Sequence, residues 1–244
     1  YDMNNNWNFY ANYAKGRRSP VVNADASGVT VTKAEIVDSY DVGVKYQSAN
    51  FTFTGAVFTY QYSDYQQSYT DAETLQSITV TVGDSTMSGI EGMATYQYSD
   101  TLSFTTSLGF LDAEFADETA EGTPFEYGGN KFRLAPEVSG AININKLVEM
   151  DNWLLDFNWL TSFQSKVYFE SSNYPGLWQD TYSLTDVSMK VSKDNSPFAF
   201  ELYVDNLLDK EYLIDAGNTG GGLGIPTFVR GMPRIAGVRL YYDF

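Results

Sequence analysis

The last eleven residues of the chain, Arg234 to Phe244, constrain its fold more than any other segment. Counting back from Phe244, every second residue is apolar or aromatic, and these residues are Tyr242, Leu240, Val238 and Ala236. A period of two predicts a β-strand with one apolar face and one mixed face. In a soluble protein that apolar face needs a partner sheet, whereas in a transmembrane β-barrel it faces lipid. We expect a barrel to close at this strand.

The same alternation recurs along the whole chain and predicts about ten strands. The expected strands are Trp7–Lys15, Ala34–Gln47, Phe51–Gln66, Met87–Tyr98, Leu102–Phe110, Lys131–Asn145, Trp153–Gln164, Tyr182–Ser192, Phe198–Asp209 and Val229–Phe244. Short turns alternate with long polar loops, which are expected at 16–32, 67–84, 112–129, 170–180 and 215–226. Long loops at one end and short turns at the other are typical of outer-membrane barrels, whose long loops are extracellular. The predicted fold class is therefore all-β, as an antiparallel transmembrane β-barrel.

Composition excludes several function classes. The 244 residues contain no Cys and no His, so disulfides, thiolate chemistry, the usual zinc sites and His-based catalysis are excluded. The formal net charge of −16 argues against nucleic acid as a partner, because phosphate binding needs a basic surface. No convergent catalytic group is visible, so we expect no enzyme activity, no cofactor and no resident metal.

The beginning of the sequence indicates a piece of a longer protein. Tyr1 is followed by a polar stretch with neither the basic region nor the apolar region of a secretion signal. An expected strand, Trp7–Lys15, starts almost at the first residue. We therefore expect a mature chain or a fragment, and we favour the fragment.

Five short motifs follow one another along the chain. They are Phe9-Tyr-Ala-Asn-Tyr-Ala-Lys-Gly-Arg-Arg-Ser-Pro20, Glu35-Ile-Val-Asp-Ser-Tyr-Asp-Val-Gly-Val-Lys45, Gly89-Ile-Glu91, Asn206-Leu-Leu-Asp-Lys-Glu-Tyr212 and Pro233-Arg-Ile-Ala-Gly-Val238 with its continuation to Phe244. In this order and spacing they resemble the C-terminal part of the barrel of a TonB-dependent outer-membrane receptor. Leu208 stands where Phe is commoner in that family, and Ile235 stands where a polar residue is usual.

The resemblance implies a domain organisation and a function. Residues 1–244 would form the C-terminal part of the barrel domain, without the plug domain, as an open half-barrel of a larger plugged barrel of about 22 strands. Such a receptor imports a scarce nutrient, such as a ferric siderophore, and is energised through TonB. The implied location is the bacterial outer membrane. The implied partners are outer-membrane lipid, lipopolysaccharide, the barrel-assembly machinery, TonB and a small ligand.

Three sets of residues are candidates for function. The resemblance assigns an assembly signal to Gly237, Leu240, Tyr242 and Phe244. Alternation places six charged residues on the face that lines the lumen: Asp41, Lys45, Glu91, Asp156, Glu201 and Arg239. The candidates for contact with ligand in the loops are Arg17, Arg18, Tyr174 and Trp178. Arg17 and Arg18 also fit a solvated surface pair, and Tyr174 and Trp178 also fit membrane-interface anchors.

Two other loop features have simpler interpretations than binding sites. The Gly-rich segment Gly217–Gly224 lacks the Lys-Ser/Thr of a phosphate-binding loop, which favours a flexible extracellular loop. The acidic residues at 112–121 could bind Ca²⁺ or reach lipopolysaccharide through divalent ions, but they lack EF-hand spacing, which favours a solvated loop.

Two other protein classes fit the same alternation. One is a passive ten-stranded outer-membrane pore or adhesin, in which Trp7–Lys15 would pair with the terminal strand. The other is a soluble all-β carbohydrate-binding protein, whose apolar faces would pack on one another.

Overall fold

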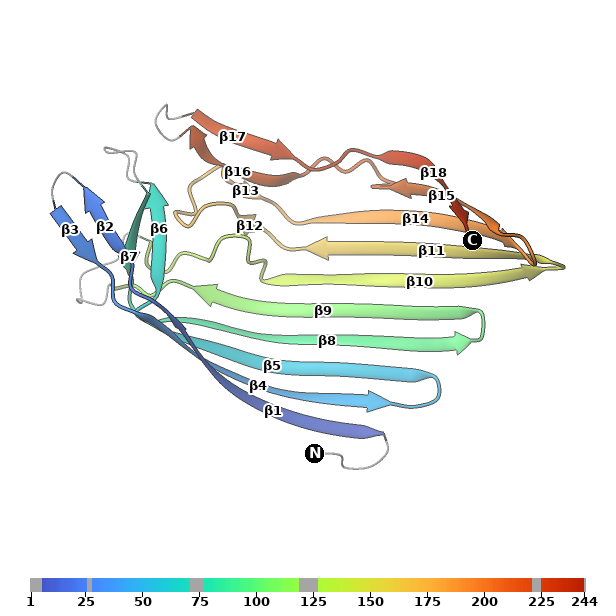
Figure 1. Ribbon diagram of the computed structural model, residues 1–244, viewed down its shortest axis with the longest axis horizontal. Coiled ribbons are helices and arrows are strands. Elements are labelled where there is room, and N and C mark those ends of the chain that lie inside the picture. The colour runs from blue at the N-terminus through green and yellow to red at the C-terminus, as the bar shows by residue number, and fades with distance from the viewer. Residues whose placement is uncertain (1–5, 26–27, 71–76, 119–126, 221–224, 244) are drawn as a thin grey trace.

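Ten long strands form one antiparallel sheet in the computed structural model, which describes residues 6–25, 28–70, 77–118, 127–220 and 225–243 (Figure 1). In sheet order the strands are β1 (Trp7–Arg18), β4 (Glu35–Gln47), β5 (Phe51–Ser63), β8 (Ser85–Ser99), β9 (Leu102–Glu114), β10 (Val138–Met150), β11 (Trp153–Gln164), β14 (Tyr182–Lys193), β15 (Phe198–Asp205) and β18 (Ile235–Tyr242). Each strand pairs with its neighbours in chain order, once the short hairpins are set aside. The predicted all-β antiparallel architecture of about ten strands is confirmed.

The long connections are more ordered than the sequence predicted. Four of them contain two-stranded sheets: β2 (Val22–Asp25) with β3 (Gly28–Val31), β6 (Gln66–Thr70) with β7 (Ser77–Thr81), β12 (Val167–Tyr168) with β13 (Trp178–Gln179), and β16 (Leu213–Gly220) with β17 (Ile225–Arg230). Figure 1 shows these hairpins toward one end of the sheet, opposite the short turns. The sequence predicted long loops at these places but no strands within them, and pairing two arms of a loop satisfies their backbone groups.

Several predicted strand boundaries were also wrong, and three of them have a clear physical reason. β10 begins at Val138 rather than at residue 131, because Leu134 adopts a left-handed φ of 55° in the segment before it. β15 ends at Asp205 because Asn206 has a φ of 51°. β18 begins at Ile235 rather than at residue 229, because Val229 pairs within the β16–β17 hairpin. A left-handed residue interrupts a strand, and alternation does not reveal it.

One face of the sheet is apolar and exposed. Residues directly opposite each other in an antiparallel ladder share a face, and the register aligns Val42, Val57, Ile90 and Phe110 in one row. Farther along the sheet, Phe157, Leu202, Val238 and Leu240 lie on this face and are 38–66% exposed. A continuous apolar surface of this size marks a face that contacts lipid or another apolar partner.

The buried core lies among the hairpins rather than under the sheet. One cluster contains Val167, Phe169, Leu177 and Ala216, with Leu213 against it. The other contains Ala113, Phe115 and Phe132, with Tyr65, Met87, Leu111, Tyr127 and Ala135 against it. Within the described ranges no second sheet covers the apolar face, and none of the chain forms a helix long and apolar enough to cross a membrane. A soluble sandwich would bury that face, so the soluble alternative has no support here.

The sheet is open at β1 and β18. Among the described residues, β1 pairs only with β4 and β18 pairs only with β15. Figure 1 shows β1 and β18 along opposite margins of the sheet. The structure therefore contradicts closure of these ten strands on themselves, which the passive pore required.

We expect the 244-residue chain to self-associate when it is produced alone in detergent. Two bare edges present unpaired N–H and C=O groups along whole strands, and another chain can pair with them. Light scattering after gel filtration should give a mass of two chains or more. A complete protein that contains this chain should run as a monomer. A stable monomer of the 244-residue chain would contradict the open edges.

Candidate functional site

The six charged residues that the alternation assigned to the lumen lie on one face of the sheet, opposite the apolar face. Register pairs Lys190 with both Asp156 and Glu201, and it pairs Glu201 with Arg239. Asp41, Lys45 and Glu91 lie on the same face of β4 and β8. We call this face the polar wall, and its orientation toward a lumen stays a prediction.

A shallow hollow in the polar wall brings Lys45 and Glu91 together. Its polar-wall side chains come from Tyr10, Lys45, Thr54, Ala56, Glu91, Met93, Ser107 and Ser139. The Tyr10 ring fills the space above Gly43, where a Cβ atom would clash with it. Lys45 Nζ lies 5.5 Å from the centroid of the same ring. The hollow therefore presents a positive and a negative side chain, hydroxyl groups and an aromatic ring to a partner on this face.

A denser network lies beside the β18 edge. Arg239 Nη1 donates to Glu201 Oε2 at 3.1 Å, and the Tyr241 hydroxyl donates to the same oxygen at 2.5 Å. The Arg239 guanidinium lies 3.9 Å from the centroid of the Tyr203 ring. Tyr203 covers Gly237, which explains why a residue without a side chain suits that position. The network holds a positive group and an aromatic group at the edge where a next strand would pair.

Amide side chains contact two further carboxylates of the polar wall, Asp41 and Asp156. Asn12 donates to Asp41 at 2.9 Å, and Asn145 donates to Asp156 at 2.6 Å. Each pair joins adjacent strands on one face. An amide N–H donor to a carboxylate of the next strand therefore links the two strands on this face.

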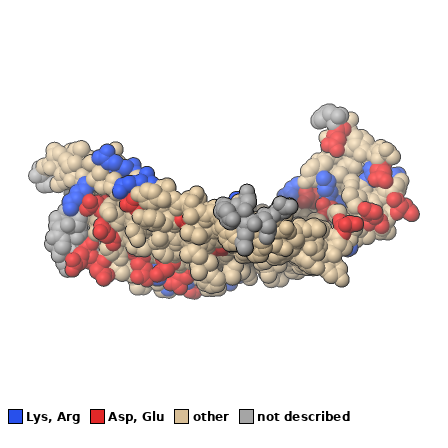
Figure 2. Space-filling model, turned by 90° about the horizontal axis from the view of Figure 1, so that it is seen from below, with Lys and Arg blue, Asp and Glu red and all other residues tan. Residues whose placement is uncertain are grey.

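The two arginines proposed for ligand contact lie on opposite faces. Alternation along β1 places Arg18 on the polar wall and Arg17 on the apolar side. Arg18 Nη1 donates to the Gln66 carbonyl at 3.2 Å and lies 3.9 Å from Glu35. Figure 2 shows Lys and Arg side chains in groups toward both ends of the molecule, with Asp and Glu side chains beside them. The two arginines therefore do not act together, and a ligand role for either stays a prediction.

Tyr174 and Trp178 also differ in their surroundings. Tyr174 is 64% exposed, whereas Trp178 meets Tyr168 edge to face and has Lys166 Nζ 4.0 Å from its ring centroid. Lys166 Nζ also lies 4.5 Å from the Tyr168 centroid. A cation between two rings is a stable arrangement that holds Trp178 in place. Tyr174 is therefore the more accessible of the two for a ligand, and its role stays a prediction.

Gln66, which no sequence pattern singles out, joins the first two long connections. Its side chain is 2% exposed, and its Nε2 donates to the carbonyls of Ser19 and Lys33 at 3.1 and 2.8 Å. Its backbone N–H donates to Glu35 at 2.7 Å. Polar glutamine in a Tyr/Gln/Ser-rich segment gives no sequence signal of burial, so only the contacts identify it.

Lys131 is a second residue that the sequence analysis did not single out. Its ammonium contacts Asp112 at 2.9 Å, Glu114 at 2.5 Å and Glu137 at 3.0 Å. Burial lowers the pKa of Lys131, but hydrogen bonds to these three carboxylates raise it by more, so the pKa lies well above its usual range. Two members of the predicted acidic run therefore hold a lysine. No group of side chains suited to a metal ion occurs in the described part of the chain.

Asn206, in the fourth family-like motif, ties three segments together. Its side chain donates to the carbonyls of Lys210 and Met232 at 2.9 and 3.1 Å and accepts from the Lys210 N–H at 2.8 Å. Its backbone N–H donates to Asp186 at 2.7 Å. Asn206 therefore positions the segment that leads into β18.

Glu170 lies beneath the Gly-rich segment, against Gly217. Burial raises the pKa of the Glu170 carboxyl, the positive charge of Arg133 lowers it, and the negative charge of Asp215 raises it, with a net upward shift. Gly217 belongs to β16, which corrects the prediction of a flexible loop for the start of this segment. Gly221–Gly224, Glu121 and the assembly-signal residue Phe244 lie outside the described residues.

The raised pKa predicts a pH dependence for this hairpin region. The folded state takes up the Glu170 proton more readily than the unfolded state, so stability is greatest at low pH and falls as pH rises through the folded pKa. Glu170→Gln should slow amide exchange in residues 167–179 at pH 7 and leave it unchanged near pH 4. Glu211→Gln, at an exposed carboxyl nearby, should leave exchange in 167–179 unchanged at both pH values. Equal effects of the two substitutions would contradict the burial of Glu170.

A single-layer antiparallel sheet with one apolar face, one charged face, short turns at one end and folded loops at the other defines a segment of a wide β-barrel. The profile of the family described as "TonB dependent receptor-like, beta-barrel" matches residues 1–207. The chain therefore belongs to the TonB-dependent receptor family, in its β-barrel domain. This is a family of outer-membrane transport receptors rather than enzymes.

Individual relatives agree with this assignment. The chain is 22% identical over 218 residues to the pesticin receptor of Yersinia pestis. The aligned region covers 87% of this chain and 30% of that receptor. The crystal structure of the ferric yersiniabactin uptake receptor FyuA from Yersinia pestis superposes with a TM-score of 0.83 at 22% identity, over 100% of this chain and 36% of FyuA. The crystal structure of BauA, the ferric preacinetobactin receptor from Acinetobacter baumannii, superposes with a TM-score of 0.76 at 18% identity, over 99% of this chain and 35% of BauA. The chain thus spans about a third of the length of these relatives.

Proposed function

We propose that residues 1–244 are the C-terminal part of the barrel domain of a receptor that imports a scarce nutrient, such as a ferric siderophore, across the bacterial outer membrane. The observation that carries the proposal is the open ten-stranded sheet with one apolar face and one charged face, in a chain of the receptor family. The names of FyuA and BauA support a ferric siderophore as the ligand class. The copper transporter OprC also shares the fold, at a TM-score of 0.73 and 16% identity, so the fold alone is compatible with other metal cargo.

Each face of the sheet has a separate role in this proposal. The apolar face contacts outer-membrane lipid and lipopolysaccharide, and the polar wall faces the lumen, where Lys45, Glu91 and Arg239 are available to a plug domain. The hairpins at the loop end capture ligand, and energy delivered through TonB moves the plug. The terminal strand, with Gly237, Leu240, Tyr242 and Phe244, presents its backbone edge and alternate side chains to the barrel-assembly machinery.

Uptake by the complete receptor tests this function. The gene for the complete receptor would be expressed in an iron-starved host that lacks its own siderophore receptors, and ⁵⁵Fe uptake would be measured with a panel of ferric siderophores. We expect uptake of one class of ferric siderophore, and we expect uptake to stop when TonB is deleted. Uptake that persists without TonB would contradict the energised receptor, and failure with every iron chelate would contradict iron as the cargo.

A further inference from the structure

The five long connections between the sheet strands contact one another in an unbroken series at the end opposite the short turns (Figure 1). Among the described residues, each connection is joined to the next by hydrogen bonds or by packed aromatic rings. We call the five together the rim and number them connections one to five. In chain order they are 19–34, 64–84, 115–137, 165–181 and 206–234.

Two asparagine side chains act as two-point clamps between connections. The Asn173 amide donates to the Lys131 carbonyl at 3.0 Å, and its oxygen accepts from the Lys131 N–H at 2.8 Å. The Asn23 amide treats Thr79 in the same way, donating to the carbonyl at 2.7 Å and accepting from the N–H at 3.1 Å. One side chain thus pairs with both backbone groups of one residue, as the opposite residue of an antiparallel ladder does. Each clamp therefore fixes both the position and the orientation of the connection it holds.

Connection four is the part of the rim that touches the most distant neighbours. Ser171 is 6% exposed, and its hydroxyl accepts from Gln67 Nε2 of connection two at 3.1 Å. Its carbonyl accepts from Asn130 of connection three at 3.0 Å. Toward connection five, Gln179 Oε1 accepts from the Leu213 N–H at 2.7 Å. A change in the position of connection four would therefore be felt by connections two, three and five.

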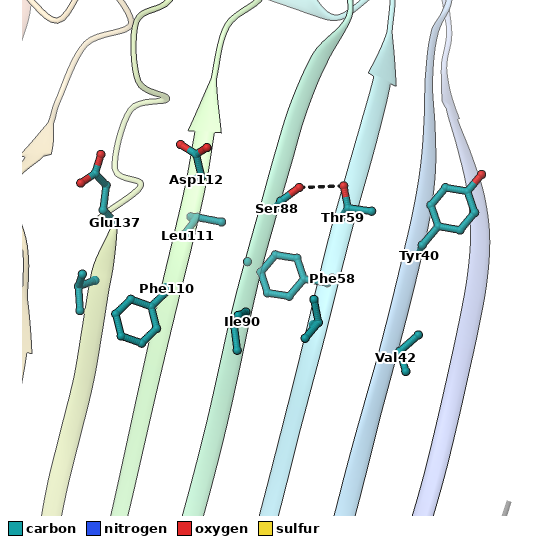
Figure 3. A pocket seen from close by; sticks show the side chains of 13 residues that line it. Tyr40, Val42, Phe58, Thr59, Ser88, Ile90, Phe110, Leu111, Asp112 and Glu137 are labelled. Carbon is teal, nitrogen blue, oxygen red and sulfur yellow. Dashed lines mark hydrogen bonds between the residues drawn. The ribbon is translucent and has the colours of Figure 1, made fainter.

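The Asn173 clamp also reaches the sheet, because its partner Lys131 is held there. The Lys131 ammonium contacts Asp112 on β9 at 2.9 Å and Glu137, just before β10, at 3.0 Å. Figure 3 shows these two carboxylates at the loop end of the two strands. The residue after Lys131, Phe132, stacks on Tyr65 of connection two, with ring centroids 5.3 Å apart. Connection three is therefore held by the sheet on one side and by connections two and four on the others.

We propose that Asn23 and Asn173 hold the five connections as one preformed rim, and that Asn173 thereby acts as a positioning residue for ligand capture. The role in capture rests on the proposed function, whereas the clamps rest on the contacts above. A surface that is already ordered loses less conformational entropy when it binds. Loosening the rim should therefore weaken ligand binding. The strand ladders should stay intact, because Asn173 lies outside the strands.

Asn173→Gly tests the clamp in the complete receptor. Asn173 has a left-handed φ of 48°, which glycine adopts without strain, so the substitution removes only the side chain. Without ligand, we expect hydrogen exchange of the amides of residues 127–135 to accelerate about tenfold, the effect of losing hydrogen bonds of ordinary strength. Exchange in β8 and β11 should stay unchanged. Asn23→Ala should likewise accelerate exchange in β7, and unchanged exchange there would overturn the Asn23 clamp.

Uptake kinetics test the positioning role. The probes are ⁵⁵Fe-labelled ferric yersiniabactin and ferric preacinetobactin, the chelates named for FyuA and BauA. For Asn173→Gly, we expect the apparent KM of the imported chelate to rise about fivefold, with the maximal rate per folded receptor unchanged. A defect in folding alone would lower the number of receptors and leave KM as it was.

Asn195→Gly is the matched control, because Asn195 is exposed in the turn between β14 and β15 and has a φ of 57°. It should change neither exchange in residues 127–135 nor KM. Unchanged exchange in Asn173→Gly would overturn the Asn173 clamp, and accelerated exchange without a rise in KM would overturn the positioning role. Uptake of neither chelate would count against the proposed ligand class, while exchange, measured without ligand, would still decide the clamps.

Discussion

Replacing Val238 with arginine is expected to remove most of the complete receptor from the outer membrane. Val238 lies in the middle of β18, opposite Leu202, and is 66% exposed on the apolar face. A charged side chain near the bilayer midplane of a barrel costs about 2–4 kcal/mol. The measurement is the amount of folded receptor in outer-membrane fractions, detected by its altered gel mobility before heating.

The matched control changes the next residue, on the opposite face. Arg239→Leu removes the 3.1 Å contact with Glu201, but the Tyr241 hydroxyl still donates to that carboxylate. We therefore expect a clearly smaller loss of folded receptor than Val238→Arg produces. Equal losses from the two substitutions would mean that the faces of β18 are assigned wrongly.

Asn206→Ala is expected to give the second largest effect. The side chain is 4% exposed, and removing it leaves the Lys210 N–H and the carbonyls of Lys210 and Met232 without these hydrogen bonds. These three hydrogen bonds are partly buried, and a hydrogen bond typically contributes about 0.5–1.5 kcal/mol, so we expect a loss of about 3 kcal/mol in the stability of this region. Amide exchange in residues 206–234 of the complete receptor should accelerate at least a hundredfold, while exchange in β8 and β9 stays unchanged.

Asn195 provides the control for backbone strain. Asn195 and Asn206 both adopt a left-handed backbone, with φ of 57° and 51°, but Asn195 is exposed in the turn between β14 and β15. Asn195→Ala carries the same conformational penalty of about 1–2 kcal/mol without breaking the buried hydrogen bonds. If both substitutions accelerated exchange equally, the hydrogen bonds of Asn206 would have no special role.

Alternation predicts a strand well where each face has one environment along its whole length. β11 runs over Trp153–Gln164 as the alternation predicted, because its aromatic residues share one face and its polar residues share the other. β10 begins several residues after its predicted start at Lys131. Lys131 itself lies before the strand, where its ammonium contacts three carboxylates. Those carboxylates lie up to 19 residues away, so a local pattern carries no information about them.

The contacts of the candidate residues were less predictable than their faces. Period two places Glu201 and Arg239 on one face of their strands, but only the pairing of β15 with β18 sets them opposite each other. The adjacent arginines at 17 and 18 could be read as a pair, yet strand geometry turns them to opposite faces. Gln66 and Asn206 carry no local signal of burial, and their importance follows from partners on separate strands.

The sequence by itself determined most of the strands, their two faces and the family, because these depend on residues close together in the chain, whereas the pairing of strands decided that the sheet is open at β1 and β18. Only the tertiary structure decided the hairpins in the loops, the Lys131 cluster, the Asn206 contacts and the hollow beside Lys45 and Glu91. These features depend on which strands become neighbours and in what register. A shift of one residue in register would turn every side chain to the other face, so the polar wall exists only once the pairing is set.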